Sequence, residues 1–519
     1  AGKRVLLLER GHDQDFKDIP RDHLRNHRFT RYGHNTGPEL ARNPRVFVDN
    51  DSLEHVIAPH DDDYQNNAMT VGGGTRVFGA QAWRFLPTDF AMASTYGTPP
   101  GSSLADWPIS YADLAPFYQR AEWEIGVAGD SAATARIWQR ERAFPMPPVS
   151  MNRQGAVLRR AADTLGWNTF SVPLLINSVP YGGRPACIHC QHCVGFGCPA
   201  NAKNGTHNTM IPRALATGRC ELVSQAFVER IDSDGTGHVA GVTYIDTHGQ
   251  RHSPRAEVVI CAASAIETAR LLLNSASPHD PNGLGNQHDQ VGRNLQGHYY
   301  PSTIGLLPES VYDGIGPGVT TATVQFNHGN ADVIGGGMLA DEFIVLPIIF
   351  WARQLPPGLP RWGLANKQWM RENFTRVLRV TGPVQEIPSP DARVTLDPAM
   401  RDRWGMPVAR LSGTSHPETV RTAEFMHART AEWLRAAGAT QLWGKPPRLR
   451  ISGGQHQAGT CRMGDDPQTS VVDRTCRVHG YDNLYIADGS VHVTNGGFNP
   501  VLTIMALAFR AAEHVAQEW

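Results

Sequence analysis

The stretch AGKRVLLLERGH, residues 1–12, decides the fold class. Val5 to Leu8 form an unbroken apolar run, which is typical of a buried parallel strand, and Glu9 stands where that strand would end. A strand ending in an acid is typical of the second strand of a dinucleotide-binding βαβ unit, where the carboxylate accepts hydrogen bonds from a ribose. The glycine-rich phosphate turn of such a unit lies roughly 20 residues earlier. The sequence therefore predicts an α/β nucleotide-binding domain, and we expect its first strand and GxGxxG turn upstream of residue 1.

Length and composition indicate an ordinary globular protein of two domains. A chain of 519 residues is longer than one hydrophobic core usually supports. Its formal net charge of −1, with 19% charged residues, gives no reason to expect a nucleic acid or an anionic membrane as partner. The densest apolar stretch, FIVLPIIFW (343–351), has the length of a strand and contains a proline, so we expect no transmembrane segment. The location stays open between cytoplasm and periplasm.

The order of elements along the chain indicates how the domains are arranged. Residues 220–276 alternate short strands and turns, and close with the strand AEVVICAA and the helix IETARLLL. Residues 300–350 and 376–412 are rich in strand signals, and residues 418–439 form an amphipathic helix that ends at Gly438. Strand-and-helix material returns at the C-terminal end. This order predicts a nucleotide domain into which a substrate domain is inserted.

Two C-terminal turns carry side chains suited to chemistry. NLYIADGS (483–490) places Asp488 at the end of a buried strand, where ligands of α/β sheets bind, although a plain turn is the alternative. GGQHQAGTCRMG (453–464) places His456 in a glycine-flanked turn. The chain has 22 histidines and a lone one is more often structural than catalytic, so the glycines raise the odds only modestly.

The last helix has an unusual start, GGFNPVLTIM (496–505). Asn499 suits the N-cap and Pro500 the first helical position, which is a common structural use of both residues. A cap does not explain the glycine pair before Asn499. The pair would let the helix amides approach a ligand that carries negative charge, for example a reduced flavin.

These motifs together resemble the glucose–methanol–choline (GMC) flavoenzyme family, in the branch of gluconate dehydrogenase flavoproteins and pyranose oxidases. The resemblance rests on HQAGTCRMG, on VVDRTCRVHGYDNLYIADGSV and on the last helix with its glycine pair. TVGGGTRVFGAQAWRF (70–85) is similar to the family's first flavin-contacting signature and VVICAASAIETARLLLNS to its second, followed by VGRNLQGH (291–298). The motifs come in the family's order and span almost the whole chain.

The resemblance implies an FAD/NAD(P)-binding Rossmann-like domain and a substrate domain built on an antiparallel sheet plus helices, α+β overall. We expect the FAD domain to comprise residues 1–105, 187–300 and 441–519, and the substrate domain residues 106–186 and 301–440. A histidine that binds FAD covalently in some members aligns with Val77, so we expect noncovalent FAD. The implied cofactor-binding residues are Glu9, Arg10, Gly72, Gly73, Gly74, Thr75, Gly79, Ala80, Val228, Asp488, Gly489, Asn499, Pro500 and Val501.

The resemblance also implies an activity, the oxidation of a CH–OH group of an alcohol, polyol or sugar. His456 carries over as the active-site base and Asn499 as its partner, which orients the same oxygen while hydride passes to flavin N5. His298 and His492 are the next choices for the base. The alternatives are a flavin-dependent lyase of the same family, and an electron-transfer subunit. The electron acceptor stays open, and a small or cytochrome subunit is a further partner to expect.

Half of the eight cysteines stand in CIHCQHCVGFGCPANAKNGT, in the pattern C-x2-C-x2-C-x4-C-P. Bacterial ferredoxins have the same pattern with a last gap one residue shorter, so Cys187, Cys190, Cys193 and Cys198 suit an iron–sulfur cluster. Zinc, with help from the two histidines of the segment, is a further choice, and a disulfide or free thiols are the alternative without metal. Related dehydrogenase subunits carry a cluster in a comparable segment. The scattered Cys220, Cys261, Cys461 and Cys476 suit buried packing.

Overall fold

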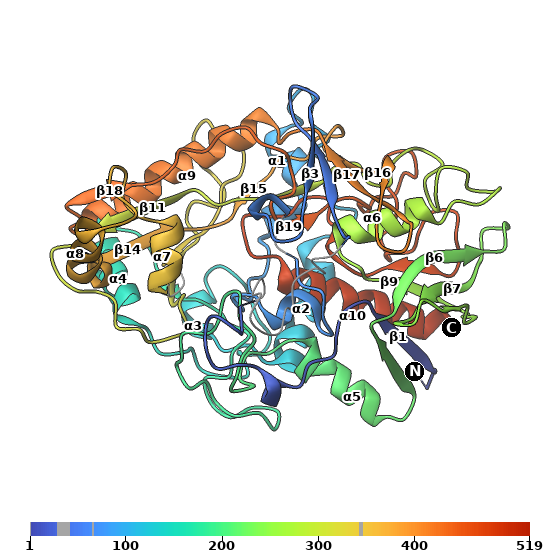
Figure 1. Ribbon diagram of the computed structural model, residues 1–519, viewed down its shortest axis with the longest axis horizontal. Coiled ribbons are helices and arrows are strands. Elements are labelled where there is room, and N and C mark those ends of the chain that lie inside the picture. Colours follow the sequence, from blue (N-terminus) through green and yellow to red (C-terminus); the bar gives the residue numbers. More distant parts are fainter. Residues whose placement is uncertain (1, 28–41, 65–66, 342–345) are drawn as a thin grey trace.

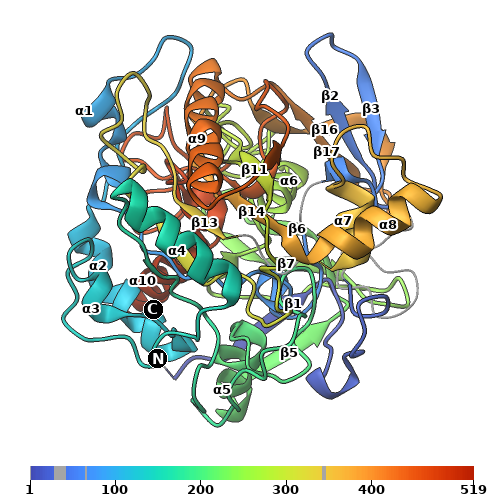
Figure 2. The ribbon, with the colours of Figure 1, turned by 90° about the vertical axis from the view of Figure 1, so that its left-hand side faces the viewer.

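A six-stranded antiparallel sheet forms one end of the molecule, at the left of Figure 1. Helices α9 (Pro417–Ala436) and α4 (Arg153–Leu165) lie against each other over this sheet, as Figure 2 shows. The expected antiparallel sheet with helices is therefore present. Its strands, in spatial order, are β18 (Gln441–Trp443), β11 (Ser302–Leu306), β14 (Val377–Thr381), β13 (Leu339–Asp341), β12 (Thr321–Thr323) and β4 (Phe170–Ser171). The computed structural model describes residues 2–27, 42–64, 67–341 and 346–519.

Two pairs of parallel strands lie at the opposite end, close to both chain termini (Figure 1). The predicted first strand, β1 (Val5–Glu9), pairs with β5 (Cys220–Ser224), and β9 (Val259–Cys261) pairs with β20 (Leu484–Ile486). The α/β class is confirmed. The expected burial of β1 is wrong: Val5 is 53% exposed, because β5 is its single strand partner in the described part of the chain. Further elements outside the six-stranded sheet are β6 (Phe227–Ser233), β7 (Val239–Ile245), β8 (Arg251–His252), α5 (Met210–Ala216), α6 (Ala265–Asn274), α2 (Tyr111–Ala121) and α10 (Val501–Glu518).

A four-stranded sheet joins segments that the sequence assigned to different domains. β17 (Pro407–Ser412), from the expected substrate domain, pairs in parallel with β2 (Arg45–Val48), from the expected FAD domain. β16 (Arg393–Arg401) and β3 (Glu54–Ile57) complete the sheet at its two edges. The two predicted domains therefore share a sheet, and the division at residue 300 and residue 440 stays a prediction.

A small three-stranded sheet lies in the middle of the molecule (Figure 1). Its central strand β10 (Gln296–Tyr299) pairs with β15 (Val384–Gln385) on one side and with β19 (Gln455–Ala458) on the other. The turn before β19 passes so close to β10 that a Cβ atom on Gly297 would lie 2.8 Å from the carbonyl carbon of Gly453. Glycine at position 297 is therefore required for the two strands to pair as they do.

An aromatic core fixes the approach to the last helix. Trp83, at the end of the glycine loop, packs against Trp138 and Phe498, with ring centroids 6.0 and 5.8 Å apart. All three side chains are almost completely buried. Phe498 directly precedes Asn499, so this core determines where Asn499 is held.

The apolar stretch at 343–351 differs from its expected strand. Residues 343–345 lie outside the described residues, and from Pro347 the chain forms helix α7 (Pro347–Arg353) because proline suits the first turn of a helix. The other short helices are α1 (Met92–Tyr96), α3 (Ser131–Thr134) and α8 (Leu364–Asn373). Within the described ranges, none of the helices combines the length and the apolar character that a membrane crossing requires.

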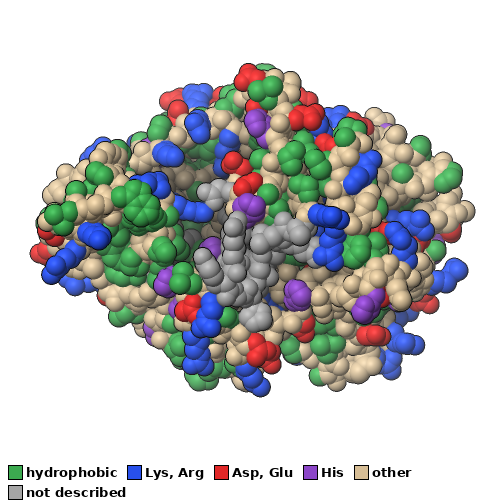
Figure 3. Space-filling model, in the orientation of Figure 1, with side chains coloured by type: hydrophobic (Ala, Val, Ile, Leu, Met, Phe, Trp, Pro, Cys, Tyr) green, Lys and Arg blue, Asp and Glu red, His purple; other side chains and the backbone are tan. Residues whose placement is uncertain are grey.

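The face in Figure 3 intersperses positive and negative side chains, without a large area of one sign. This distribution agrees with the formal net charge of −1.

Candidate active site

Two histidines from distant parts of the chain meet in the central sheet. His298 lies on β10 and His456 on β19, and their Nδ1 atoms are 3.0 Å apart. The rings meet edge to face, with centroids 5.2 Å apart. His456 has a φ of 63°, a left-handed conformation that residues other than glycine seldom adopt. The side chain of Asn495 donates a hydrogen bond of 2.8 Å to the backbone carbonyl of His456 and so supports this conformation.

The contacts of His298 determine which nitrogen of His456 can accept a proton. Nε2 of His298 lies 2.8 Å from the backbone carbonyl of Gly496, which can only accept, so Nε2 carries the hydrogen. Nδ1 of His298 then has the lone pair and accepts from the Nδ1–H group of His456. The lone pair of His456 is therefore on Nε2. The pair of histidines leaves His456 with one proton-accepting atom.

Tyr300 links the two predicted catalytic residues, and the sequence interpretation missed it. Its hydroxyl oxygen lies 3.3 Å from His456 Nδ1 and accepts a hydrogen bond of 3.3 Å from Asn499 Nδ2. The structure thus brings His456 and Asn499, which are far apart in the sequence, to the same phenol. The one available signal was the position of Tyr300 just after the segment VGRNLQGH, and this signal is too weak to identify a site residue.

Asn499 is not the N-cap of the last helix, contrary to the prediction. Pro500 occupies the cap position, α10 begins at Val501, and no side chain caps it. The amide of Asn499 instead turns toward Tyr300, and its Oδ1 is buried without a hydrogen-bond partner among the described residues. A buried acceptor without a partner is costly, so this oxygen is suited to meet a ligand.

The glycine pair before Asn499 serves packing within the protein. A Cβ atom on Gly496 would lie 2.9 Å from the ring of Phe85. One on Gly497 would lie 2.6 Å from the side-chain nitrogen of Asn327. Close approach to other protein segments therefore explains both glycines, and the expected approach to a ligand is not needed to account for them.

The histidines of the site are neutral at pH 7. Burial lowers the pKa of His456 well below its ordinary value, and the neighbouring His298 lowers it further. Burial also lowers the pKa of His298 and of His492 to about 4. A neutral imidazole is the state that a general base needs. His298 and His492 are fully buried, whereas His456 is partly exposed, which favours His456 as the residue that meets a substrate.

The glycine loop at residues 72–80 forms a tight turn. A Cβ atom on Gly72, which has a φ of 89°, would lie 2.6 Å from the Cβ atom of His207, so only glycine fits. The hydroxyl of Thr75 donates a hydrogen bond of 2.6 Å to the Gly72 carbonyl and closes the turn. Val77 is buried and has no group that could bond a flavin. Of the other residues predicted to contact the cofactor, Gly74 is exposed, Gly73 and Gly79 are half-buried, and Ala80 is buried.

Asp488 joins the end of β20 to the start of α6. Its Oδ2 accepts hydrogen bonds from the Ser264 amide (3.0 Å) and the Thr268 hydroxyl (2.5 Å). Its Oδ1 accepts from the amide of Ser490, next to Gly489, at 2.8 Å. Burial raises the pKa of Asp488, and these hydrogen bonds counteract it. The carboxylate of Asp488 thus links two segments that resemble GMC signatures, IADGS and SAIET.

The residues predicted at the adenosine end lie around the ends of β1 and β6. The Glu9 carboxylate accepts a hydrogen bond of 2.6 Å from the Gly11 amide, and burial raises its pKa. Arg10 donates to Asn43 at 3.0 Å, so that side chain has partners in the protein. Val228 lies on β6 and pairs with Tyr244 of β7, so a ligand could reach its backbone only from the side away from β7. Contacts of these residues with a cofactor stay predictions.

The four-cysteine segment lacks the geometry of a metal site. Cys187, Cys190, Cys193 and Cys198 are all described and all free thiols. Within the described ranges, no three His, Cys, Asp or Glu side chains gather as a metal ion would require. Burial raises the pKa of Cys187 to about 11 and of Cys193 to about 12, so these thiols are protonated at pH 7. The structure gives no support to the predicted cluster.

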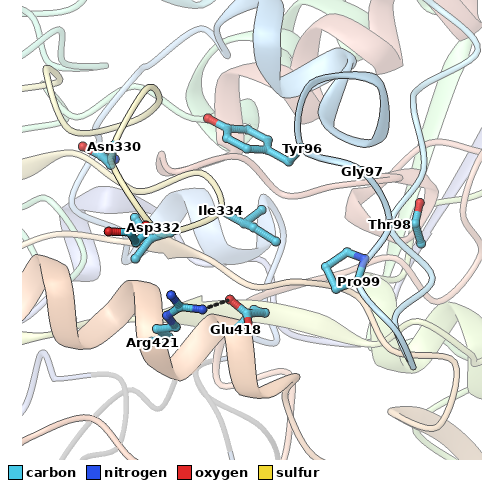
Figure 4. Close-up of a pocket in the computed structure, with 10 residues that line it drawn as sticks. Tyr96, Gly97, Thr98, Pro99, Asn330, Asp332, Ile334, Glu418 and Arg421 are labelled. Atoms are coloured by element: carbon cyan, nitrogen blue, oxygen red, sulfur yellow. Dashed lines mark hydrogen bonds and ion pairs between the residues drawn. The ribbon is translucent and has the colours of Figure 1, made fainter.

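A separate surface groove of about 570 Å³ opens near the N-terminal end of α9 (Figure 4). Tyr96 to Pro99 line one side, and Asn330 with residues 332–334 line a second. Glu418 and Arg421, which pair at 3.4 Å, line a third. Every predicted site residue is described, and none lines this groove. It is therefore distinct from the His456 site.

Comparison with known proteins identifies the family. Residues 65–300 and 388–508 match the two family models that describe GMC oxidoreductases. The chain is 32% identical to 6'''-hydroxyparomomycin C oxidase of Streptomyces lividus, over 88% of this chain and 80% of that protein. It is 30% identical to 2-methyl-1,2-propanediol dehydrogenase of Mycolicibacterium austroafricanum (100% and 92%), and 27% identical to the fructose dehydrogenase large subunit of Gluconobacter japonicus (100% and 94%).

A solved structure shows the same fold. The crystal structure of pyridoxine 4-oxidase from Mesorbium loti matches with a TM-score of 0.63 at 17% identity, over 99% of this chain and 95% of that one. The two matched family models and the relatives establish that the chain belongs to the GMC oxidoreductase family of FAD-dependent enzymes that oxidise CH–OH groups.

Proposed function

We propose that His456 is the base with which this protein oxidises a CH–OH group of an alcohol, polyol or sugar. The observation that carries the proposal is the assignment of the lone pair of His456 to Nε2 by its contact with His298. Named relatives that act on a diol, on fructose and on paromamine support the substrate class. The hydrogen bond from Asn495 to the backbone carbonyl of His456 supports a fixed position for the histidine.

The chain's own residues have two tasks in this reaction. His456 Nε2 accepts the hydroxyl proton. This step is needed because the carbon does not readily release hydride while its hydroxyl keeps the proton. Asn499 Oδ1, which lacks a partner among the described residues, accepts a hydrogen bond from a polar hydrogen of the substrate other than the one that His456 removes, and so orients the substrate. Tyr300 keeps both side chains in place through its hydroxyl. When bound, FAD supplies the acceptor for the hydride that leaves the carbon.

The residues present fit FAD bound without a covalent link. Asn499 Oδ1 is a buried polar atom without a partner in the described chain, as expected beside a polar ligand. We infer that Glu9 and Val228 hold the adenosine end, and that Gly72 to Ala80 and Pro500–Val501 lie against the flavin. Val77 stands where a covalent link would need a histidine. The proposal includes an electron acceptor that reoxidises the flavin, with a small or cytochrome subunit as the partner that passes the electrons on. We assign no residue to this step.

An absorbance spectrum tests the proposal. The full-length protein, folded and supplied with FAD, should show flavin bands that bleach anaerobically with one of fructose, 2-methyl-1,2-propanediol, paromamine or gluconate. Acid precipitation should then release the flavin into the supernatant. Absence of flavin bands would refute the proposal, and flavin retained on the pellet would refute noncovalent binding. Bleaching by substrate would exclude the lyase, because a lyase produces no net reduction.

A further inference from the structure

A buried carboxylate connects the two strands that carry the histidines. Glu386 follows directly after β15 and is fully buried. It accepts hydrogen bonds from the backbone amide of Gly297, next to His298, and from the hydroxyl of Ser452 at 2.7 Å. Ser452 begins the turn that leads to His456. One side chain thus holds both the strand of the first histidine and the turn of the second.

Arg450 completes this arrangement from the same side. Its guanidinium donates a hydrogen bond of 2.8 Å to the backbone carbonyl of His298 and lies 4.4 Å from the centre of the Tyr299 ring. Its positive charge lowers the pKa of Glu386, against burial, which raises it more. The same charge lowers the pKa of His298. The charges of Glu386 and Arg450 therefore oppose each other beside the histidine pair.

We propose that Glu386 is a positioning residue, which sets the contact between His298 and His456 by holding Gly297 and Ser452 at once. The inference rests on the proposed role of His456. A buried carboxylate is expensive to desolvate, and its two acceptor atoms are used by donors from the two segments whose register decides the contact. Misplacement by about 1 Å can lower a rate roughly 100-fold, so a holding residue can matter without touching substrate.

Glu386→Ala is the informative variant because it removes both hydrogen bonds at once. Glu386→Gln is the conservative variant, because the amide oxygen still accepts from Gly297 and the Ser452 hydroxyl can turn to accept from the amide nitrogen. Glu386→Gln should therefore keep the positioning that Glu386→Ala loses. Asp341→Asn is the matched control. Asp341 is also a buried carboxylate, accepting hydrogen bonds of 2.8 Å from the amides of Thr320 and Thr321, away from the histidines.

The experiment compares anaerobic flavin reduction in the holoenzyme, using whichever compound of the panel bleaches the parent fastest. For Glu386→Ala we expect a limiting rate reduced roughly 10- to 100-fold with an unchanged substrate Kd, and for Glu386→Gln a rate close to that of the parent. Asp341→Asn should lower the melting temperature but keep the parent rate. His456→Ala is measured in parallel.

The outcomes separate this inference from the proposed function. If His456→Ala is slow but Glu386→Ala keeps the parent rate while melting earlier, Glu386 only stabilises the fold and the inference is wrong. If Glu386→Ala and Asp341→Asn lower the rate alike, or if Glu386→Gln is as slow as Glu386→Ala, the two hydrogen bonds are not the cause and the inference is also wrong. If His456→Ala itself reduces flavin at the parent rate, the proposed function fails and the inference with it.

Discussion

The four-cysteine segment holds more reactive side chains than the His456 turn, yet it is around His456 that side chains from distant segments meet. Around His456 the fold gathers His298, Tyr300 and Asn499 from segments far apart in the sequence. Around Cys193 the fold gathers Lys203 instead. Its ammonium donates hydrogen bonds to the backbone carbonyls of Cys193, Phe196 and Phe78 at 2.8–3.0 Å.

The difference teaches that density of ligand-type residues and convergence of their side chains are separate properties. The cysteine segment is held by backbone carbonyls that accept from a buried lysine, and among the described residues no three side chains gather there as a metal ion would require. The histidine site is held by strand pairing, which aims side chains from two strands at one point. The predictions that follow test each side of this contrast.

The largest effect is expected for His456→Ala. Loss of a positioned base should lower the rate of flavin reduction by roughly two to four orders of magnitude. FAD should stay bound, because His456 is proposed to face the substrate. Stopped-flow reduction measures the rate, and His55→Ala, at an exposed histidine bonded to Asp49, is the control. A parent rate in His456→Ala would move the base to another residue.

Lys203→Ala tests what holds the cysteine segment. It removes the donor of three backbone carbonyls, and each buried acceptor left without a donor costs about 1–3 kcal/mol. The melting temperature should fall by several degrees, while Lys17→Ala, at an exposed lysine, should leave it unchanged. Equal melting of the two variants would show that Lys203 does not support the segment.

Asn499→Ala separates the orienting role from the capping role that the structure rejects. The rate should fall roughly tenfold or more, because an oriented hydrogen bond to substrate is lost. The melting temperature should change little, since Asn499 makes no cap bond. Asn499→Asp should also be slow, because the added negative charge opposes the reduced flavin. A clear loss of stability in Asn499→Ala would restore the cap.

Acid should destabilise the protein through its buried histidines. Burial lowers the pKa of His298 and His492 to about 4 and of His207 to about 3. In the unfolded chain a histidine has a pKa of about 6.5, so on acidification the unfolded chain binds protons before the folded protein does. The free energy of unfolding therefore does not depend on these groups above pH 6.5. Below pH 6.5 it falls by about 1.4 kcal/mol per pH unit for each group, until the pH reaches that group's pKa in the folded protein. Thermal melts between pH 7 and 5 measure this, and a flat profile would contradict it.

The smallest effect is expected in the cysteine segment. Cys187→Ser and Cys190→Ser should leave the rate of flavin reduction unchanged, because no thiol there gathers around a reactive centre. Iron and acid-labile sulfide, measured on anaerobic preparations, should be absent. Stoichiometric iron and sulfide, lost in both variants, would restore the cluster that the sequence predicted.

The sequence by itself determined the family, the fold class and FAD, and through the resemblance to that family it predicted His456 and Asn499 as site residues. These depend on short motifs whose glycines and strand ends record local backbone requirements, and such requirements can be read without a structure. Gly72 illustrates this, because the turn it makes admits no side chain. The helix at 418–439 was predictable for the same reason, since its pattern is local.

Only the tertiary structure decided which side chains act together. The contact of His298 with His456 spans 158 residues and depends on the register of β10 and β19, which no local pattern records. Tyr300 and Glu386 were missed because each matters through a partner far away in the sequence. The cap at Asn499 was predicted wrongly because the buried Phe498 and the bond to Tyr300 outweigh a local preference. The physical reason is common to all: propensity acts between neighbours, whereas packing and pairing act between segments that meet only in the folded chain.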